Sequence, residues 1–389
     1  MIPPRETVAR VRPLMDRMGI TRVANVTNLD VIGIPVVMVV RPNSRTNCVS
    51  QGKGTDLDAA KASGLMESVE AFHAERIQLP LRLASYERLR HEERTVEIRK
   101  LPRAKDSRFH KRLKLQWAEG RDILQNESIW LPYEVVHLNF CLPFPSGSGC
   151  FFRSSNGLAS GNHILEAISH GLCEVVERDA AALWDLLGRR AQAKTRLDLD
   201  SVDDPACREI LEKYERAKMF VAAWVVPSEV GIPAFRCSVF PRTAWGVHSV
   251  HPALGYGCHP DRGVALHRAL TEAAQSRLTF ITGSRDDLQK SDYDPRHIAE
   301  YLKEEETLLK SSTTMRRFSD VVSGSSRSID EDVAWELECV RHAGFERVIV
   351  VDLTQPEVGL PVARVVIPGM EVSSLVPGQR ARAFRRAHS

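Results

Sequence analysis

The chain has 389 residues, 43% hydrophobic and 26% charged, which is typical of a globular protein with a large core. A net charge of +3 indicates neither a nucleic-acid nor a membrane partner, and no apolar run is long enough for a membrane span. The eight cysteines are scattered without C-x-x-C pairs, which argues against a zinc ribbon and predicts a reduced, cytoplasmic setting.

Strand patterns outnumber those that a strict alternation of strand and helix would need. We therefore expect an α+β fold with helices layered on one side of mostly antiparallel or mixed sheets. In chain order, the predicted elements are a helix over 5–18, strands over 20–26 and 36–40, a helix over 57–75, a turn and strand over 117–138, helices over 162–181 and 205–218, strands over 219–226, 234–240 and 245–249, helices over 263–282, 297–309 and 330–342, and strands over 347–353 and 362–367.

The first segment with chemical character is a polar loop followed by an acidic helix. The loop, Arg41 to Gly54, closes with glycines on either side of Lys53, a pattern that suits either the close approach of an anion or an ordinary turn. On the helix that follows, Ser63, Glu67 and Glu70 share one face because they are four and three residues apart.

A strongly basic run covers 98–114, with eight Lys or Arg residues against one acid, Asp106. Such runs are most often solvated or disordered, and the alternative is a docking surface for an acidic peptide or partner protein. Phe109 is the only aromatic residue in the run, which argues against a platform for stacking nucleic-acid bases.

The central segment begins as a loop of small residues over 154–161 and continues as a helix with Asn162 as the candidate N-cap. One face of this helix is expected to face either water or a cation such as Mg²⁺, which prefers hard oxygen ligands. The histidine on that face is either a general base or, as is more common, a structural residue. The residues of this face are Glu166, His170, Glu174 and Glu177.

A third segment repeats the arrangement of a glycine loop, here 255–261, before a helix. Its helix, 263–282, places Arg268, Glu272 and Gln275 on one face, and Arg285 follows shortly afterwards. Each loop offers backbone N–H groups that suit phosphate oxygens, and each helix offers carboxylates or amides that suit Mg²⁺ or its waters. Together with the cations Arg178 and Arg285, the three segments predict a site for a triphosphate with bound magnesium.

The whole chain, 1–389, is expected to be a single domain with the nucleotide held between subdomains. Its core is expected over about 15–285 and 345–375, with a polar insertion or flexible arm over 286–330 and a basic tail over 376–389.

Three motifs resemble the YcaO family of enzymes, which use ATP to modify peptide backbone amides. The resemblance covers most of the chain, and its N-terminal third is similar to the branch that works with a TfuA-type partner. The motifs are G-K-G-x8-S-x3-E-x2-E over 52–70, S-N-G-L-A-S-G-x4-E-x7-E-x2-E-R-D-A over 155–180, and R-A-L-x-E-A-x-Q-S-R with G-S-R-D-D over 268–287.

This resemblance implies ATP and Mg²⁺ as cofactors, a peptide or protein substrate, a TfuA-like partner and a homodimer. It implies that Ser63, Glu67, Glu70, Glu166, Glu174 and Glu177 surround ATP and its metal ions, with Glu67, Glu70, Glu174 and Glu177 as metal ligands. Phosphate or ribose contacts are implied for Asn156, Arg178, Gln275 and Arg285, and Lys53 and Glu272 are further cofactor-binding candidates. The implied catalytic residues are Glu67, Glu70, Arg178 and Arg285, and Ala71 stands where the family often has an arginine.

The hypothesis for the reaction is that a nucleophile adds to a backbone carbonyl, whose oxygen then takes the γ-phosphate of ATP and leaves as phosphate. Azoline-forming members of the family commonly end in a proline-rich tail, whereas this chain ends in a basic segment over 380–389. That difference favours a thioamide, with sulfide as the nucleophile, over an azoline made from a substrate Cys, Ser or Thr.

Two further alternatives stay open. A silent ATP-binding partner or scaffold would bind Mg-ATP without peptide-dependent phosphate release. A carboxylate-bridged metallohydrolase would bind metal tightly without nucleotide. None of the eight cysteines has a setting that marks it as a nucleophile.

Overall fold

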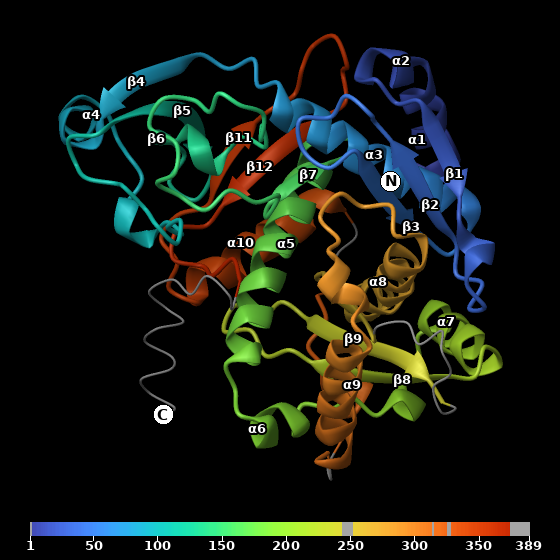
Figure 1. The fold of residues 1–389 in the computed structure, drawn as a ribbon. Coiled ribbons are helices and arrows are strands. Elements are labelled where there is room, and N and C mark those ends of the chain that lie inside the picture. The colour runs from blue at the N-terminus through green and yellow to red at the C-terminus, as the bar shows by residue number, and fades with distance from the viewer. Residues whose placement is uncertain (1, 243–251, 313–314, 325–327, 374–389) are drawn as a thin grey trace. The chain divides into compact units, whose positions relative to one another are not determined.

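A computed structural model describes residues 2–242, 252–312, 315–324 and 328–373 (Figure 1). The predicted strand over 245–249 and the predicted basic tail over 376–389 lie outside these residues. The chain divides into two compact units, and the helix Leu57–Glu75 contributes residues to both. Unit 1 comprises Met1–Asn43, Asn47–Ser68 and Leu187–Ser325, and unit 2 comprises Ser44–Thr46, Val69–Leu186 and Ser326–Ser389.

Unit 1 contains two three-stranded antiparallel sheets, in the orders β1-β2-β3 and β10-β9-β8. The long helix α8 packs against β10 and β9, and α7 packs on α8. Gly19, in a left-handed conformation, ends the N-terminal helical segment as predicted. The elements are α1 (Pro4–Val11), α2 (Met15–Met18), β1 (Arg22–Asn25), β2 (Val36–Val40), β3 (Val49–Lys53), α3 (Leu57–Glu75), α6 (Arg189–Ala193), α7 (Pro205–Arg216), β8 (Met219–Val225), β9 (Ala234–Pro241), β10 (Ala253–Cys258), α8 (Arg262–Thr282) and α9 (Pro295–Lys310).

Unit 2 is built on a six-stranded sheet in the order β4-β5-β11-β12-β7, with β6 on the other side of β5. Helix α5 lies against β12 and β7, and α10 lies against α5 (Figure 1). The pairings between the named strands of this sheet are antiparallel. The elements are β4 (Leu81–Ser85), α4 (Tyr86–Glu92), β5 (Lys114–Asp122), β6 (Glu127–Pro132), β7 (Leu158–Ser160), α5 (Ile164–Asp185), α10 (Ile329–His342), β11 (Ile349–Asp352) and β12 (Val362–Val366).

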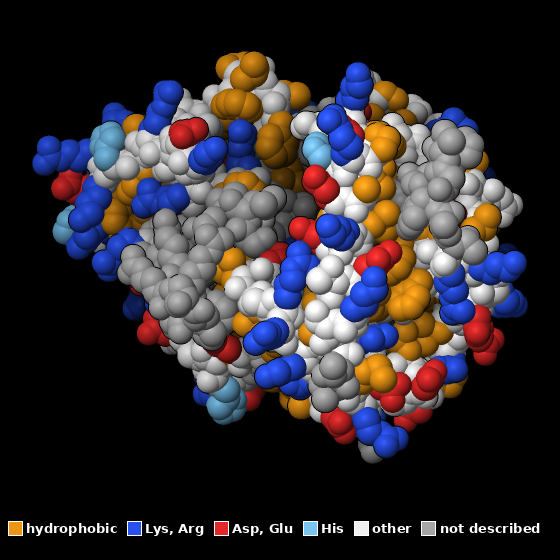
Figure 2. Space-filling view, turned by 60° about the horizontal axis from the view of Figure 1, so that its bottom comes forward, with side chains coloured by type: hydrophobic (Ala, Val, Ile, Leu, Met, Phe, Trp, Pro, Cys, Tyr) orange, Lys and Arg blue, Asp and Glu red, His pale blue; other side chains and the backbone are white. Residues whose placement is uncertain are grey.

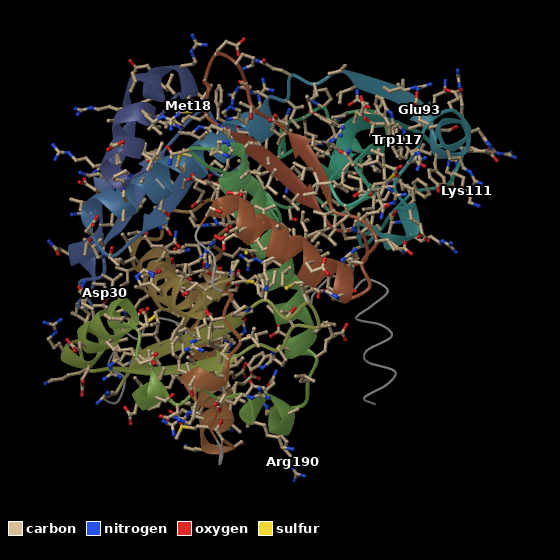
Figure 3. All side chains as sticks on the ribbon, turned by 180° about the vertical axis from the view of Figure 1, so that it is seen from behind. Met18, Asp30, Glu93, Lys111, Trp117 and Arg190 are labelled. Atoms are coloured by element: carbon tan, nitrogen blue, oxygen red, sulfur yellow. The ribbon has the colours of Figure 1, made fainter. Side chains whose placement is uncertain are left out.

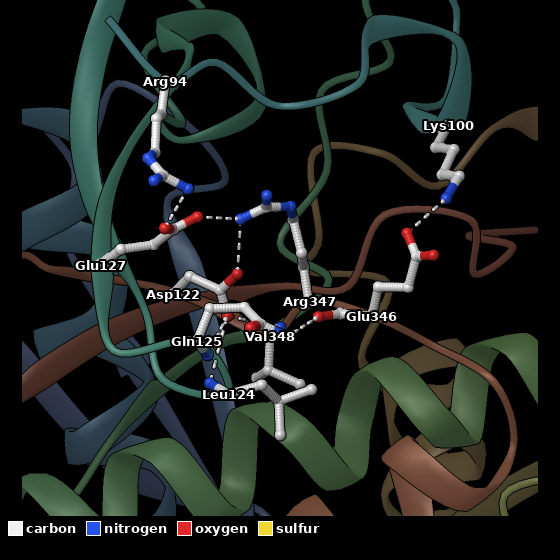
Figure 4. A network of polar contacts seen from close by, with 9 residues as sticks. All are labelled: Arg94, Lys100, Asp122, Leu124, Gln125, Glu127, Glu346, Arg347 and Val348. Carbon is white, nitrogen blue, oxygen red and sulfur yellow. Dashed lines mark hydrogen bonds and ion pairs between the residues drawn. The ribbon is translucent and has the colours of Figure 1, made fainter.

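A polar network joins the β5–β6 hairpin to the start of β11 (Figure 4). The fully buried carboxylate of Asp122 accepts hydrogen bonds from the backbone N–H groups of Leu124 and Val348, at 3.1 and 3.3 Å. Arg347 donates to Asp122 at 2.8 Å and to Glu127 at 2.7 Å, so the buried charge is paired and its oxygens are satisfied. This network stabilises the pairing of strands that are more than 200 residues apart in the chain.

Two glycine segments that were predicted as phosphate-binding loops are strands. Gly52 lies in β3, and Gly255 and Gly257 lie in β10, where each glycine allows a helix to come very close. A Cβ atom on Gly52 would stand 2.0 Å from the carbonyl oxygen of Ala60, and one on Gly255 would stand 2.1 Å from that of Ala269. The loop prediction was therefore wrong for both segments, because these glycines serve strand–helix packing.

Smaller corrections concern the central segment and the expected polar arm. Residues 158–160 form strand β7, and the N-cap of α5 is His163, whose side chain accepts the Leu165 N–H, in place of the predicted Asn162. Within 286–330, helix α9 places Ile298 and Leu302 against Phe240 in an apolar cluster. The division into two compact units does not test whether the chain is a single domain, which stays a prediction.

Candidate nucleotide site

Six of the twelve predicted site residues belong to unit 1, and three of them gather around β3. Lys53, the last residue of β3, makes a 2.7 Å ion pair with Glu272 of α8, and both side chains are about a fifth exposed, at 22% and 23%. Glu272 also accepts the backbone N–H of Tyr256 in β10 at 3.2 Å. Gln275, one turn further along α8, donates to the carbonyl of Gln51 at 2.6 Å. These contacts tie the predicted residues of α8 to the two glycine-containing strands.

Arg285 follows Gly283, which ends α8 in a left-handed conformation. Its guanidinium forms a bidentate pair with Asp287, with bonds of 2.9 and 2.5 Å. This pair raises the pKa of Arg285, and the negative charges of Glu67 and Asp286 add to the shift. Arg285 and Glu67 are therefore close enough to interact electrostatically, as two groups of one phosphate site would be. Ser63 and Glu67 are half-buried on α3.

The other six predicted residues belong to unit 2, where Glu70 of α3 contacts the end of β7. One carboxylate oxygen of Glu70 accepts both the backbone N–H of Ser160, at 2.9 Å, and its hydroxyl, at 2.8 Å. Two bonds on one oxygen fix the orientation of the carboxylate. Ser160 is thus a positioning residue that the sequence motif contained without marking its role.

Arg364 of β12 anchors the small-residue loop that carries Asn156. It is almost fully buried and donates to the carbonyls of Val136, Ser154 and Asn156 at 2.8–3.2 Å. Burial lowers the pKa of Arg364 to about 10, and the charges of Glu174 and Glu70 oppose that shift. Two predicted metal ligands therefore lie within the field of one buried cation. Sequence reasoning missed this arginine, although a lone charge inside the apolar strand Val362–Val366 was a visible signal.

The loop borders a pocket lined among others by Ser154, Asn156 and Val175. In the described part of the chain, the side-chain oxygen of Asn156 is buried without a hydrogen-bond partner. A buried carbonyl oxygen without a donor is costly, and a ribose hydroxyl or a metal-bound water would supply one. The residues present thus fit a hydroxyl-bearing or hydrated ligand at this position.

The predicted face of α5 is half-buried to buried. Glu166 accepts the backbone N–H of Asn162 at 2.7 Å, so this carboxylate satisfies a donor at the helix start. Glu177 is 6% exposed, with the nearest guanidinium nitrogen of Arg178 3.9 Å away, a separation too long for a hydrogen bond. Glu177 therefore has little access to bulk water, and the prediction that this face meets either water or a cation stays a prediction.

Over the residues that the structure describes, no three His, Cys, Asp or Glu side chains are grouped so that they could hold a metal ion alone. Mg²⁺ commonly takes one or two carboxylates and completes its shell with phosphate oxygens and waters. The oxygen-rich donor set of Glu70, Glu174 and Glu177 is chemically suited to that mode. The metal assignments of these residues and of Glu67 stay predictions.

The YcaO family, described as a cyclodehydratase family that binds ATP and Mg²⁺, matches residues 51–371 of this chain. The chain belongs to the YcaO family. The predicted family and fold are thereby confirmed, and ATP and Mg²⁺ are the cofactors of the family, as expected. YcaO membership supports an ATP-dependent, cyclodehydratase-like, peptide-modifying enzyme.

Two relatives are similar over almost their whole length. An uncharacterized protein in the tfuA 3′ region of Rhizobium leguminosarum bv. trifolii is 36% identical, covering 99% of this chain and 91% of the relative. An uncharacterized protein of Methanothermobacter thermautotrophicus is 34% identical, covering 98% of this chain and 97% of the relative. The sequence likeness therefore extends well beyond the matched YcaO region.

Two solved structures share the YcaO fold at 24% identity. A heterocyclase in complex with substrate and cofactor superposes with a TM-score of 0.79 over 95% of this chain, which spans about half (52%) of that heterocyclase. YcaO from Methanopyrus kandleri, bound with AMPPCP and Mg²⁺, superposes with a TM-score of 0.76, covering 97% of this chain and 94% of that chain. Across the described part of the chain, no helix combines the length and hydropathy that a membrane crossing requires.

Proposed function

We propose that this chain activates a peptide backbone amide with ATP and Mg²⁺ and yields a thioamide together with a TfuA-like partner and a sulfide source. The observation that carries the proposal is the 36% identity to a protein encoded in a tfuA 3′ region, over 99% of this chain. Membership of the ATP- and Mg²⁺-binding YcaO family supports the ATP dependence.

Within unit 2, we assign Glu70, Glu174 and Glu177 to Mg²⁺. The side-chain oxygen of Asn156, which has no hydrogen-bond partner among the described residues, is assigned to a hydroxyl or hydrated group of the ligand. Bound ATP supplies the phosphoryl group that turns an amide oxygen, a poor leaving group, into phosphate. The chain itself positions one of these carboxylates, because Ser160 orients Glu70 through two hydrogen bonds. Arg178 is assigned to neutralise phosphate charge.

From unit 1, we assign Glu67 to Mg²⁺ and Arg285 to the transferring phosphoryl group. Glu67 and Glu70 are three residues apart on α3, so they are neighbours on one helix face. Arg285 is held by Asp287 through a bidentate bond, and phosphate binding would require it to exchange this partner. Lys53, Ser63, Glu166, Glu272 and Gln275 are assigned to the shell around the nucleotide.

The decisive experiment is mass spectrometry of candidate peptides co-expressed with this chain, with and without the TfuA-like partner. A product in which one oxygen is exchanged for sulfur is expected. Glu67→Gln should abolish the modification while the thermal unfolding transition stays unchanged. Asp58→Asn, on the same helix, is the matched control and should keep full activity. Unchanged turnover by Glu67→Gln would refute the metal role.

An azoline-forming cyclodehydratase is the second candidate, favoured by the description of the family as cyclodehydratases. Its product would have lost one water, which the same mass spectra distinguish from sulfur exchange. Binding of Mg-ATP without peptide-dependent phosphate release would instead replace both candidates by a silent ATP-binding scaffold. Light scattering of the purified chain tests the predicted homodimer separately.

A further inference from the structure

Strand β4 (Leu81–Ser85) lies at one end of the six-stranded sheet of unit 2 and pairs with β5. Among the described residues no strand pairs with its second edge, and the ribbon shows β4 as the outermost arrow of this sheet (Figure 1). An open edge presents backbone N–H and C=O groups that can pair with another extended chain.

The side chains of β4 are two exposed leucines, one paired arginine and two small residues. Leu81 and Leu83 alternate along the strand and are 38% and 57% exposed. Arg82 points to the opposite face, where it pairs with Glu92 and Glu93 of the segment at α4. Proteins usually protect an edge with charges, proline or a covering element. Here Pro80 precedes the strand and the single charge of Arg82 is paired with Glu92 and Glu93, which leaves the edge and its two exposed leucines accessible to another chain.

The surroundings of β4 concentrate positive charge. Residues 81–114 contain twelve Lys or Arg and five Asp or Glu, a formal charge of +7 in a chain whose total is +3. Lys and Arg side chains crowd the left edge of Figure 2, the side on which α4 is labelled in Figure 1. Lys111 lies at the same periphery, near α4, in Figure 3.

Part of the basic run packs on unit 2, while its Lys and Arg side chains at 105, 108 and 111 are exposed to solvent, as is most common for such runs. Phe109 packs against Tyr86 and Phe151, with ring centroids 6.4 and 5.6 Å away, and Arg103 covers it at 4.2 Å. Ser107 donates to the carbonyl of Cys150 at 2.7 Å. These contacts hold the run on unit 2.

The charge of this run is also available to a partner. The exposed side chains of Lys105, Arg108 and Lys111 make no ion pair within the described part of the chain. The run passes close to the end of β4, since Lys114 is paired with Ser85 and the carbonyl of Lys111 accepts the Glu87 N–H.

We propose that the free edge of β4 binds an extended, acidic polypeptide as an added strand. Main-chain hydrogen bonds would supply affinity, the exposed leucines would contact apolar side chains, and Lys105, Arg108 and Lys111 would select acidic ones. The surface goes beyond the proposed reaction, and its occupancy does not depend on ATP.

Two other occupants fit this surface less well. A single-stranded nucleic acid needs exposed rings for stacking, whereas Phe109 is half-buried beneath Arg103. A second copy of the chain would bring two basic surfaces together, which like charges oppose.

The test is fluorescence anisotropy of the full chain with a labelled peptide of alternating valine and glutamate. A peptide of the same sequence, N-methylated on alternate residues, keeps the charge and loses the hydrogen-bond donors of one edge. The plain peptide is expected to bind and the N-methylated one to bind at least about tenfold more weakly. Equal binding of the two peptides would overturn strand addition.

The protein variants distinguish the contribution of the basic side chains to peptide binding from that of the strand edge. Lys105→Glu/Arg108→Glu/Lys111→Glu should weaken binding at least about tenfold, while Arg5→Glu/Arg12→Glu/Arg17→Glu, the same charge change on exposed residues of unit 1, should leave it unchanged. Leu83→Asp should also weaken binding without changing thermal stability, because Leu83 is exposed. Tighter binding of an oligouridylate, or a self-association that Leu83→Asp abolishes, would overturn the proposal.

Discussion

The glycine-containing segments of the two units look alike in the sequence and differ in the structure. In unit 1, Gly52 and Gly255 lie in strands whose backbones are paired and pressed against helices. In unit 2, the loop around Asn156 belongs to no strand or helix, is anchored by the buried Arg364, and borders a pocket with an amide oxygen that has no hydrogen-bond partner among the described residues.

The difference shows that small residues before a helix have two physical causes. One is close packing, where a side chain would collide with a helix backbone. The other is a loop whose polar atoms are available to a ligand. Such a loop is recognised by a buried polar atom without a hydrogen-bond partner, and the presence of glycine does not identify it. Even in the second region Gly157 serves packing, since a Cβ there would stand 2.2 Å from the carbonyl of Val365.

The largest effect that tests this comparison is expected from Gly255→Ala. The new methyl group would stand 2.1 Å from the backbone oxygen of Ala269, so the strand or the helix must move. We expect a loss of unfolding free energy above about 3 kcal/mol, measured by urea denaturation. Gly188→Ala, where nothing lies within 4 Å, is the control and should be neutral. A stable Gly255→Ala would show that the close approach is not required.

The next largest effect tests whether Arg364 anchors the loop that carries Asn156. Arg364→Met leaves the carbonyls of Val136, Ser154 and Asn156 without their donor and should cost about 3 kcal/mol. Hydrogen exchange over 154–158 should rise, and calorimetry should show weaker Mg-ATP binding. The stability and Mg-ATP affinity of Arg364→Lys should lie between those of the wild type and Arg364→Met, because lysine keeps the charge but lacks the planar guanidinium that donates to several carbonyls at once. Arg121→Met in β5 is the control, and equal protection of the loop in both variants would contradict the anchoring role.

The smallest effect concerns His137, which is 1% exposed. It is the next residue after Val136, whose carbonyl accepts hydrogen bonds from Arg364. Burial, with the charges of Arg153 and Arg364, lowers the pKa of His137 to about 4 from 6.5. Between these values the unfolded chain binds more protons than the folded one, so unfolding free energy falls as pH falls, by about 2 to 3 kcal/mol by pH 4.

His137→Asn keeps an acceptor for the Asn139 N–H and cannot titrate, so its denaturation curves should lose this part of the pH dependence. The exposed His91→Asn serves as the control and should retain the wild-type dependence. If His137→Asn and wild type lose equal stability between pH 6.5 and 4, the buried neutral histidine is not the cause.

Local elements were predictable because their causes are local. Helix α3 begins and ends where its periodicity predicted, and Gly19 ends the first helical segment in the expected conformation. The antiparallel character of the sheets followed from the number of strand-like runs. Strands β3, β7 and β10 were predicted as loops because small residues conceal their strand character.

The candidate site was predictable as residue types on named helices, and the YcaO motifs named the residues that family membership then made relevant. The anchors were not predictable. Ser160 binds Glu70 across 90 residues, and Arg364 binds a loop more than 200 residues away. No spacing rule in the chain encodes such contacts.

By itself, the sequence determined which helices form, which of their faces carry carboxylates, and that the chain resembles a family that uses ATP. Only the tertiary structure decided that the glycines of β3 and β10 face helices, that the buried Arg364 holds the loop of Asn156, and that the basic run packs next to an open strand edge. The physical reason is that periodicity and capping act within a few residues, whereas packing, burial and charge pairing depend on neighbours that only folding brings together.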